Sequence, residues 1–280
     1  MRSRLLTLLL APLALAALSG CGGAARGSTG DRLVLTGSST IAPLAAEIAK
    51  RFEERNPGVR VDVQTGGSSR GISDARQGLA DIGMVSRALK PEERDLQAFP
   101  IARDGICLIV HRDNPVRSLT DEQVRALFTG KVDRWSAVGG AEAPVTVVHK
   151  AEGRSTLELF LAHYRLENRE IDADVVIGDN EQGIKTVAGN PHAVGYVSIG
   201  AAEHHVRQGT PLKLLAVGGV EPSSENVRRG DYPLCRPLHL VTRSAPAGTA
   251  KAFLDFARSP EVRDLVEQQS FVPLPDGDAE

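Results

Sequence analysis

Apolar residues follow two alternating patterns along the chain. Between residues 41 and 52 they recur every three or four positions, which predicts one buried face of a helix. The run RLVLTG at 32–37 and the alternating stretch VRVDVQ at 59–64 predict strands on either side of it, and NPG at 56–58 predicts where the helix ends. Further strands are expected at 80–86, 104–112, 145–150, 173–178, 193–200, 212–217 and 238–242.

Helical spacing recurs between several of these runs. The stretch 120–130 opens with a capping box formed by Thr120 and Gln123, and a helix over 246–269 is expected to break near Ser259-Pro260. Two more helices are expected to bury Ile72, Ala75 and Leu79, and Leu157, Phe160, Leu161 and Tyr164. Because strands alternate with helices, the pattern predicts an α/β fold with a mainly parallel sheet covered by helices on both faces. A chain of 280 residues can form one large domain or two lobes.

The first thirty residues predict export. Arg2 and Arg4 precede a short apolar run that ends in LSGC, so residues 1–20 read as a signal peptide. The sequence around Cys21 resembles a bacterial lipobox, in which this cysteine carries the lipid and residues 21–31 form a flexible tether. The alternatives are an ordinary signal peptide with a chance cysteine, or a membrane anchor, although the run is shorter than the roughly 20 residues a span needs. A periplasmic or cell-surface lipoprotein is expected.

Composition narrows the classes of ligand. The net charge is −2 and the pI about 6.4, so no overall positive field favours nucleic acid. Aromatic residues make up 4% of the chain, which disfavours stacking platforms for bases or sugars. His204 and His205 are neighbours and would not face one site on a helix, so neither a metal nor a cofactor is expected.

Three predicted strand-to-helix junctions share one composition: TGSSTIAPL at 36–44, TGGSSRGI at 65–72 and KAEGRSTLEL at 150–159. Each has glycine for close backbone approach, hydroxyl groups, and a helix N-terminus that favours negative charge. One such junction alone is more readily explained by helix capping. Because ligands of α/β sheets collect at the carboxyl ends of strands, three junctions together predict a shared site for a tetrahedral oxyanion.

The second junction also contains a possible nucleophile. Gly67-Ser68-Ser69-Arg70-Gly71 matches G-x-S-x-G, the turn that presents the serine of α/β-hydrolases. That reading needs an acid and then a histidine further along the chain, and only Asp231 and His239 offer a loose match. No HGGG-like segment is present to form an oxyanion hole. Binding, with no enzyme activity, is therefore favoured over hydrolysis.

The motifs taken in order carry a family resemblance. TGSSTIAPL, GGSSRGI, ADIGMVSRALK, LFTGKVDRW, AGNPHAVGYVSIG, YPLCRPLHLVT and FVPL occur between residue 32 and about 275. In this order they resemble the phosphate-binding proteins of the bacterial ABC phosphate transporter. The resemblance implies a two-lobed type II periplasmic-binding-protein fold, with lobe 1 at 32–106 plus 237–280 and lobe 2 at 107–236. It also implies a hinge of two crossing strands, inorganic phosphate and the transporter's permease subunits as partners, and a monomer.

The resemblance also implies a set of ligands. Carried over onto this chain, the phosphate-binding residues are Thr40, Ile41 (through its backbone N–H), Ser68, Ser86, Arg87, Lys150, Arg154, Ser155 and Thr156, with close-approach glycines at Gly66, Gly67 and Gly153. Two positions depart from the best-known members, because Ser86 replaces an aspartate that accepts the phosphate proton and Lys150 replaces a loop arginine. Sulfate or molybdate binding, or a sensing or adhesion role on the same fold, therefore stay open as alternatives.

Two cysteines follow Cys21. An oxidising compartment would allow a disulfide between Cys107 and Cys235, and the resemblance implies that they lie on neighbouring hinge strands. Two buried thiols are the alternative, since sequence gives no geometry.

Overall fold

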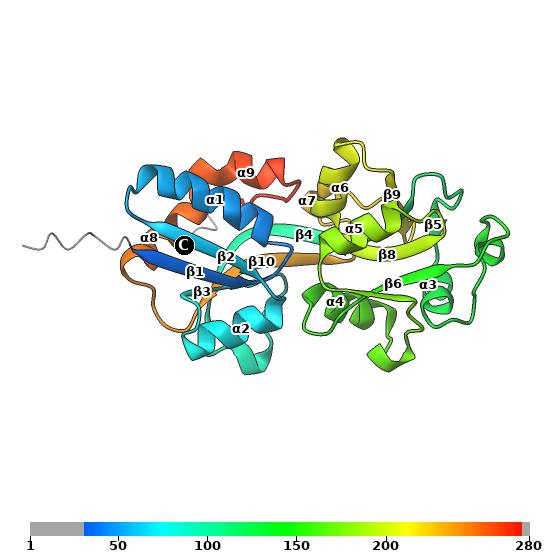
Figure 1. Cartoon of the computed structure of the whole chain (residues 1–280), viewed down its shortest axis with the longest axis horizontal. Helices are drawn as coiled ribbons and strands as arrows, with labels where there is room; N and C mark the ends of the chain where they lie inside the picture. The colour runs from blue at the N-terminus through cyan, green and yellow to red at the C-terminus, as the bar shows by residue number, and fades with distance from the viewer. Residues whose placement is uncertain (1–30, 276–280) are drawn as a thin grey trace, which may run out of the picture.

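Two lobes lie side by side and are connected by two long strands (Figure 1). The computed structural model describes residues 31–275. The predicted signal peptide, Cys21 and almost all of the predicted tether therefore lie outside the described residues. Below, lobe 1 means the elements built on residues 32–102 and 238–271, and lobe 2 the elements built on residues 106–234, because these stretches form the two main hydrophobic cores.

The elements alternate as the sequence predicts. The strands are β1 Arg32–Gly37, β2 Arg60–Thr65, β3 Ile82–Val85, β4 Gln97–His111, β5 Ser118–Leu119, β6 Thr146–Lys150, β7 Val175–Ile177, β8 Ala193–Ser198, β9 Leu212–Val217 and β10 Cys235–Thr242. The helices are α1 Ala42–Arg55, α2 Ser68–Gln77, α3 Asp121–Phe128, α4 Ser155–Tyr164, α5 Asn180–Ala188, α6 Ile199–Arg207, α7 Ser224–Arg229, α8 Gly248–Ala257 and α9 Arg263–Gln268. The short helices α5, α6 and α7 were not predicted.

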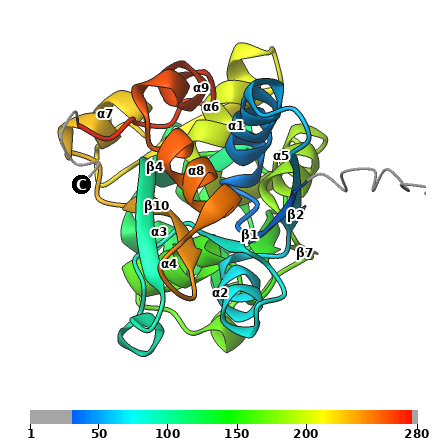
Figure 2. The same cartoon turned by 90° about the vertical axis from the view of Figure 1, so that its left-hand side faces the viewer.

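The sheet runs through both lobes. In the described part of the chain its strand order is β2-β1-β3-β10-β4-β8-β6-β7, with β9 on β4 and β5 on β9. Strands β1, β2 and β3 are parallel in lobe 1, as are β6, β7 and β8 in lobe 2, and the antiparallel strands β4 and β10 lie between the two sets. Helices cover both faces (Figures 1 and 2), so the predicted α/β class is confirmed.

Lobe 1 buries the helix face that the sequence predicts. Ile48 and Phe52 of α1 are buried, and the rings of Phe52 and Phe253 meet edge to face at 5.3 Å. One prediction is wrong: Leu79 is 66% exposed. Helix α2 ends at Gln77 because Gly78 takes a left-handed conformation with φ 69°, which turns the chain before Leu79 can face the core.

Lobe 2 has an aromatic centre. The rings of Phe160 and Tyr196 stack with their centroids 3.9 Å apart, and the indole N–H of Trp135 donates to the His192 carbonyl at 2.8 Å. Trp135 and Tyr196 are therefore core residues. The capping box of α3 is confirmed as well, with the Gln123 amide donating to Thr120 Oγ1.

The hinge is formed by β4 and β10, which lie antiparallel with Cys235 opposite Gly105. Strand β4 begins at Gln97, seven residues before the start expected from the sequence, so one strand continues from lobe 1 into lobe 2. The C-terminal segment adds a third link, since Arg103 and Val272 exchange backbone hydrogen bonds of 2.8 and 2.9 Å. The lobe boundaries expected from the sequence, at 106/107 and 236/237, remain a proposal. They divide β4 and β10, the two long strands that connect the lobes.

Of the two possibilities that the sequence left open, the structure has free thiols and no disulfide between Cys107 and Cys235. Cys107 and Cys235 lie on neighbouring strands, but both are free thiols. Cys235 is paired with Gly105, and its thiol donates to the Tyr232 carbonyl at 2.9 Å. Cys107 is two residues further along β4, where its side chain is buried in lobe 2 and contacts the Val197 carbonyl. The strand register therefore separates the two sulfur atoms.

No helix within residues 31–275 is both long enough and apolar enough to cross a membrane.

Candidate functional site

The three predicted junctions meet at one small cavity between the lobes. Its volume is about 10 Å³. Lobe 1 contributes the loop before α1, the start of α2 and the end of β3, and lobe 2 contributes the end of β6 and the start of α4. The lining residues are Ser38, Ser39, Thr40, Gly67, Ser68, Ser86, Lys150, Arg154, Ser155 and Thr156.

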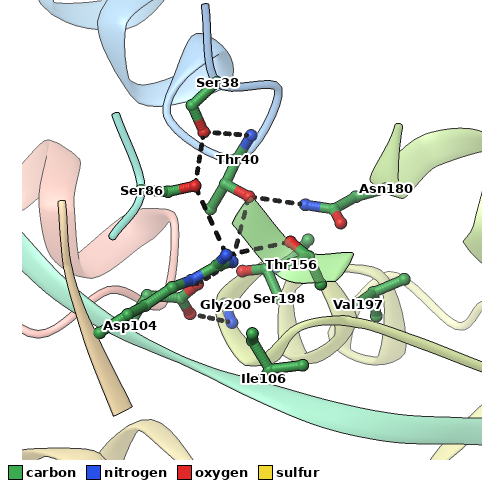
Figure 3. Close-up of polar contacts among 12 residues, drawn as sticks. Ser38, Thr40, Ser86, Asp104, Ile106, Thr156, Asn180, Val197, Ser198 and Gly200 are labelled. Carbon is green, nitrogen blue, oxygen red and sulfur yellow. Dashed lines mark hydrogen bonds and ion pairs between the residues drawn. The ribbon is translucent and has the colours of Figure 1, made fainter. Parts of the chain in front are cut away.

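The lobe 1 wall is a connected set of hydroxyl groups. Ser38 Oγ donates to Ser86 Oγ at 2.9 Å and accepts from the Thr40 amide at 3.2 Å (Figure 3). Ser68 Oγ accepts from the Ser86 amide at 3.1 Å. All four side chains are buried, so these bonds fix their positions. A hydroxyl has one proton and two lone pairs, so this wall can donate to an oxyanion and also accept a hydrogen bond from it.

The lobe 2 wall carries charge. Lys150 ends β6, and its ammonium is buried with no hydrogen-bond partner among the described residues. Burial, together with the positive charges of Arg236 and Arg154, lowers the pKa of Lys150 to about 7, although Asp179 opposes this shift. Ser155 Oγ and Arg154 Nε, at the start of α4, are also buried without a partner in the described chain. Buried polar groups normally have partners, so these groups are suited to hydrogen-bonding an anion.

An arginine that the sequence analysis did not single out connects the two walls. Arg236 of β10 is completely buried, and its guanidinium binds Asp104 through hydrogen bonds of 2.7 and 3.0 Å. It also donates to Thr40 Oγ1 of lobe 1 at 3.1 Å and to Thr156 Oγ1 of lobe 2 at 2.9 Å. A positive charge therefore lies at the hinge, in contact with both lobes. The signal in the sequence was a charged residue inside a buried strand, which has to be paired.

Glycine lets the lobes approach closely here. Gly67 has φ 92°, and a Cβ at this position would lie 2.5 Å from the carbonyl oxygen of Gly153 in the other lobe. Gly153 has φ 78°, which also favours glycine. At Gly66 a Cβ would meet only the flexible side chain of Arg70, so the backbone does not require glycine there.

Comparison with known proteins agrees with this architecture. Residues 22–261 match the family model described as the PBP superfamily domain. The chain belongs to the PBP superfamily. It is 28% identical over 288 residues to the phosphate-binding protein PstS of Bacillus subtilis (strain 168), which covers 97% of this chain and 94% of the relative.

Two solved PBP structures are similar over most of the chain. One, from Clostridium perfringens, is described as a phosphate ABC transporter substrate-binding protein with bound phosphate; it shares 31% identity with a TM-score of 0.81, covering 87% of this chain and all of that one. The other is an ABC-type phosphate transport receptor from Vibrio cholerae, with 29% identity, a TM-score of 0.71, and coverage of 86% and 100%. Within the PBP superfamily, the chain is thus a member of the phosphate ABC transporter substrate-binding proteins.

Most of the ligands implied by the family resemblance line this PBP cavity, but two do not. Ile41 lies at the start of α1 with its side chain buried in the lobe 1 core, so only its backbone is directed to the loop. The guanidinium of Arg87 is bound to Glu93 through hydrogen bonds of 2.6 and 2.8 Å, and Arg87 does not line the cavity. Arg236, and not Arg87, is the buried arginine that reaches the cavity residues.

The hydrolase alternative finds no support in the described residues. Ser69 is the second residue of α2, its amide donates to the Gly153 carbonyl at 3.3 Å, and its hydroxyl faces Glu158 at 3.5 Å. It has no histidine partner in the described chain. Asp231 is exposed and pairs with Arg229.

The two neighbouring histidines contact different groups. His205 Nε2 lies 2.9 Å from Glu181 Oε1, and its other ring nitrogen contacts Thr210. No group of three or more potential metal ligands occurs among residues 31–275.

Proposed function

We propose that the protein captures inorganic phosphate between its lobes and delivers it to the permease of an ABC transporter. The observation that supports this most is the buried ammonium of Lys150, which has no partner in the described chain and lines a small cavity together with Arg154. A bound dianion would neutralise these charges and accept hydrogen bonds from Ser155 and the helix N-termini. The names of the relatives point to the same ligand.

Binding in this proposal involves no covalent chemistry. The lobe 1 hydroxyls are already held by one another, so little order is lost when they turn to the anion. Closure removes water, which strengthens each charge-assisted hydrogen bond. The protein acts as a monomeric binding protein in this scheme.

A broader oxyanion site is the second candidate. The residues that line the cavity include no carboxylate in the described chain. Sulfate carries no proton and is rejected most strongly by a fixed acceptor, whereas the Ser86 hydroxyl can either donate or accept. The hydroxyl-lined lobe 1 wall therefore discriminates phosphate from sulfate less strongly than an aspartate would.

Calorimetry distinguishes a phosphate site from a broader oxyanion site. Protein stripped of ligand is titrated in parallel with phosphate, sulfate and molybdate. We expect phosphate to bind most tightly and to raise the melting temperature, since a ligand at 1,000 times its Kd adds about 4 kcal/mol to the free energy of unfolding. Heat with sulfate or molybdate equal to that with phosphate would favour the broader site, and no heat with any of them would contradict both.

We also propose that the mature protein is anchored through a lipid on Cys21, outside the cytoplasm. The LSGC sequence supports this, and family membership is consistent with export. Full-length protein expressed in a bacterial host should partition into detergent, and Cys21→Ala should remain in the aqueous phase. Equal partitioning of both would contradict the anchor.

A further inference from the structure

Beside the cavity, a carboxylate of lobe 2 contacts several residues of lobe 1. Glu158 belongs to α4 of lobe 2, and its side chain is 27% exposed. Its Oε2 lies 3.1 Å from Arg87 Nε and 3.0 Å from Lys90 Nζ, while its Oε1 lies 3.5 Å from Ser69 Oγ. All three partners belong to lobe 1, so these contacts exist only while the lobes are closed.

The lobe 1 side of this contact is held in place independently of lobe 2. Both terminal nitrogens of Arg87 bind Glu93, which also accepts from the Lys90 amide at 2.9 Å. Only Nε of Arg87 is left to face Glu158. When the lobes separate, Arg87 keeps its bidentate partner and Glu158 returns to water. Neither charge is left buried and unpaired, so the contact can form and break at low cost.

Helix α4 connects this contact to the cavity. Its first two residues, Ser155 and Thr156, line the cavity, and Glu158 follows within the next turn. On a helix, residues three apart lie on the same side. A movement that brings the N-terminus of α4 onto an anion therefore also brings Glu158 onto Arg87 and Lys90.

We propose that Glu158 is an interlobe latch: a positioning residue that does not touch phosphate and sets the lifetime of the closed complex. This inference rests on the proposed function. The latch and the anion both favour the closed state, so removing the latch lowers the apparent affinity by the amount of closure energy that is lost. Because the latch contacts exist in the closed state and break when the lobes open, the main effect on phosphate binding falls on the dissociation rate.

The test is Glu158→Gln, which keeps the size and removes the charge. We expect Kd for phosphate to rise about tenfold, with most of the change in koff and kon within about twofold of wild type. The difference should shrink between about 0.15 M and 0.5 M salt, because partly exposed ion pairs are screened. Rapid-mixing measurements with radiolabelled phosphate give both rates.

The matched control is Asp95→Asn. Asp95 pairs with Arg76 at 2.8 Å, but both residues belong to lobe 1, so the variant removes one negative charge without altering the contact between lobes. Its koff should equal that of wild type. A Glu158→Gln koff equal to wild type, or an equal rise in Asp95→Asn, would overturn the latch.

Small-angle scattering of the phosphate-free proteins gives a readout that needs no ligand. The latch predicts a larger radius of gyration for Glu158→Gln than for wild type and Asp95→Asn. If calorimetric titration of wild type with phosphate gives no heat, the proposed function is contradicted, and the radii of gyration alone test the latch. Equal radii of gyration for wild type and Glu158→Gln would then overturn the latch.

Discussion

The two walls of the cavity differ in how far their polar groups are already satisfied. On the lobe 1 wall, Ser38, Ser68 and Ser86 are hydrogen-bonded to one another or to nearby backbone. On the lobe 2 wall, Lys150 Nζ and Ser155 Oγ are buried without a partner in the described chain. The polar groups of the lobe 1 wall are therefore satisfied within the protein, whereas the lobe 2 wall keeps buried groups that are free to bond an anion.

This difference assigns separate roles to the lobes. In the proposed function, charge in lobe 2 attracts the anion and provides most of its binding free energy, because charge-assisted hydrogen bonds are the stronger ones. The hydroxyl wall of lobe 1 fixes the shape of the closed cavity and can both donate and accept. Arg236 belongs to neither wall, since it contacts Thr40 and Thr156 from the hinge. Three substitutions and one pH experiment would break or sharpen this comparison.

Arg236→Met should have the largest effect, because it removes the charge that both walls share. Phosphate binding should become undetectable by calorimetry. The free energy of unfolding should fall by about 3–5 kcal/mol, since Asp104 is left buried and unpaired. The matched control, Arg236→Met with Asp104→Asn, should recover most of the stability and none of the binding. Recovery of binding in the double variant would show that Arg236 serves the hinge alone.

Lys150→Met should weaken phosphate binding by about 2–5 kcal/mol, which is the range for removing one partner of a buried charge pair. The phosphate-free protein should become more stable, because the variant removes a buried ammonium with no partner in the described chain. Titration calorimetry and urea unfolding check the two changes. A loss of both phosphate binding and stability would contradict the proposal that Lys150 is a buried ammonium whose partner is the bound anion.

Lys150 should also make the stability of the phosphate-free protein depend on pH. Its pKa is about 7 in the folded protein, against an ordinary value of 10.5. Between these values the unfolded chain holds a proton that the folded protein lacks, so the free energy of unfolding rises with pH. Between pH 7 and pH 9, wild type should gain about 2 kcal/mol relative to Lys150→Met by urea unfolding. If the free energy of unfolding changes with pH in the same way for wild type and Lys150→Met, Lys150 is solvated in the folded protein and the lobes are open.

Ser68→Ala, on the uncharged wall, should have the smallest effect. Binding should weaken by about 1–3 kcal/mol, the cost of depriving a charged acceptor of one donor. Its neighbour provides the control: Ser69→Ala should change Kd little, because the Ser69 hydroxyl makes only a long contact with Glu158. A serine-reactive probe that labels wild type and not Ser69→Ala would instead revive the nucleophile hypothesis.

The sequence alone determined the parts of the site that local spacing controls. Glycines and hydroxyls at strand-to-helix junctions predict helix N-termini open to an anion, and Thr40, Ser68, Ser155 and Thr156 all line the cavity. The helix face of α1 was equally predictable, since its period of three and four residues is set within a single element.

Only the tertiary structure decided the rest, because it depends on contacts between residues far apart in the chain. Arg236 reaches the cavity through a register that puts β10 beside β4, and the same register separates Cys107 from Cys235. Arg87 pairs with Glu93, six positions away, and with Glu158, seventy-one positions away. No local pattern in the sequence indicates that Arg87, which the family resemblance implies as a phosphate ligand, pairs with these carboxylates instead. Periodicity specifies which face of an element is buried, whereas the packing of one lobe against the other specifies which charges meet.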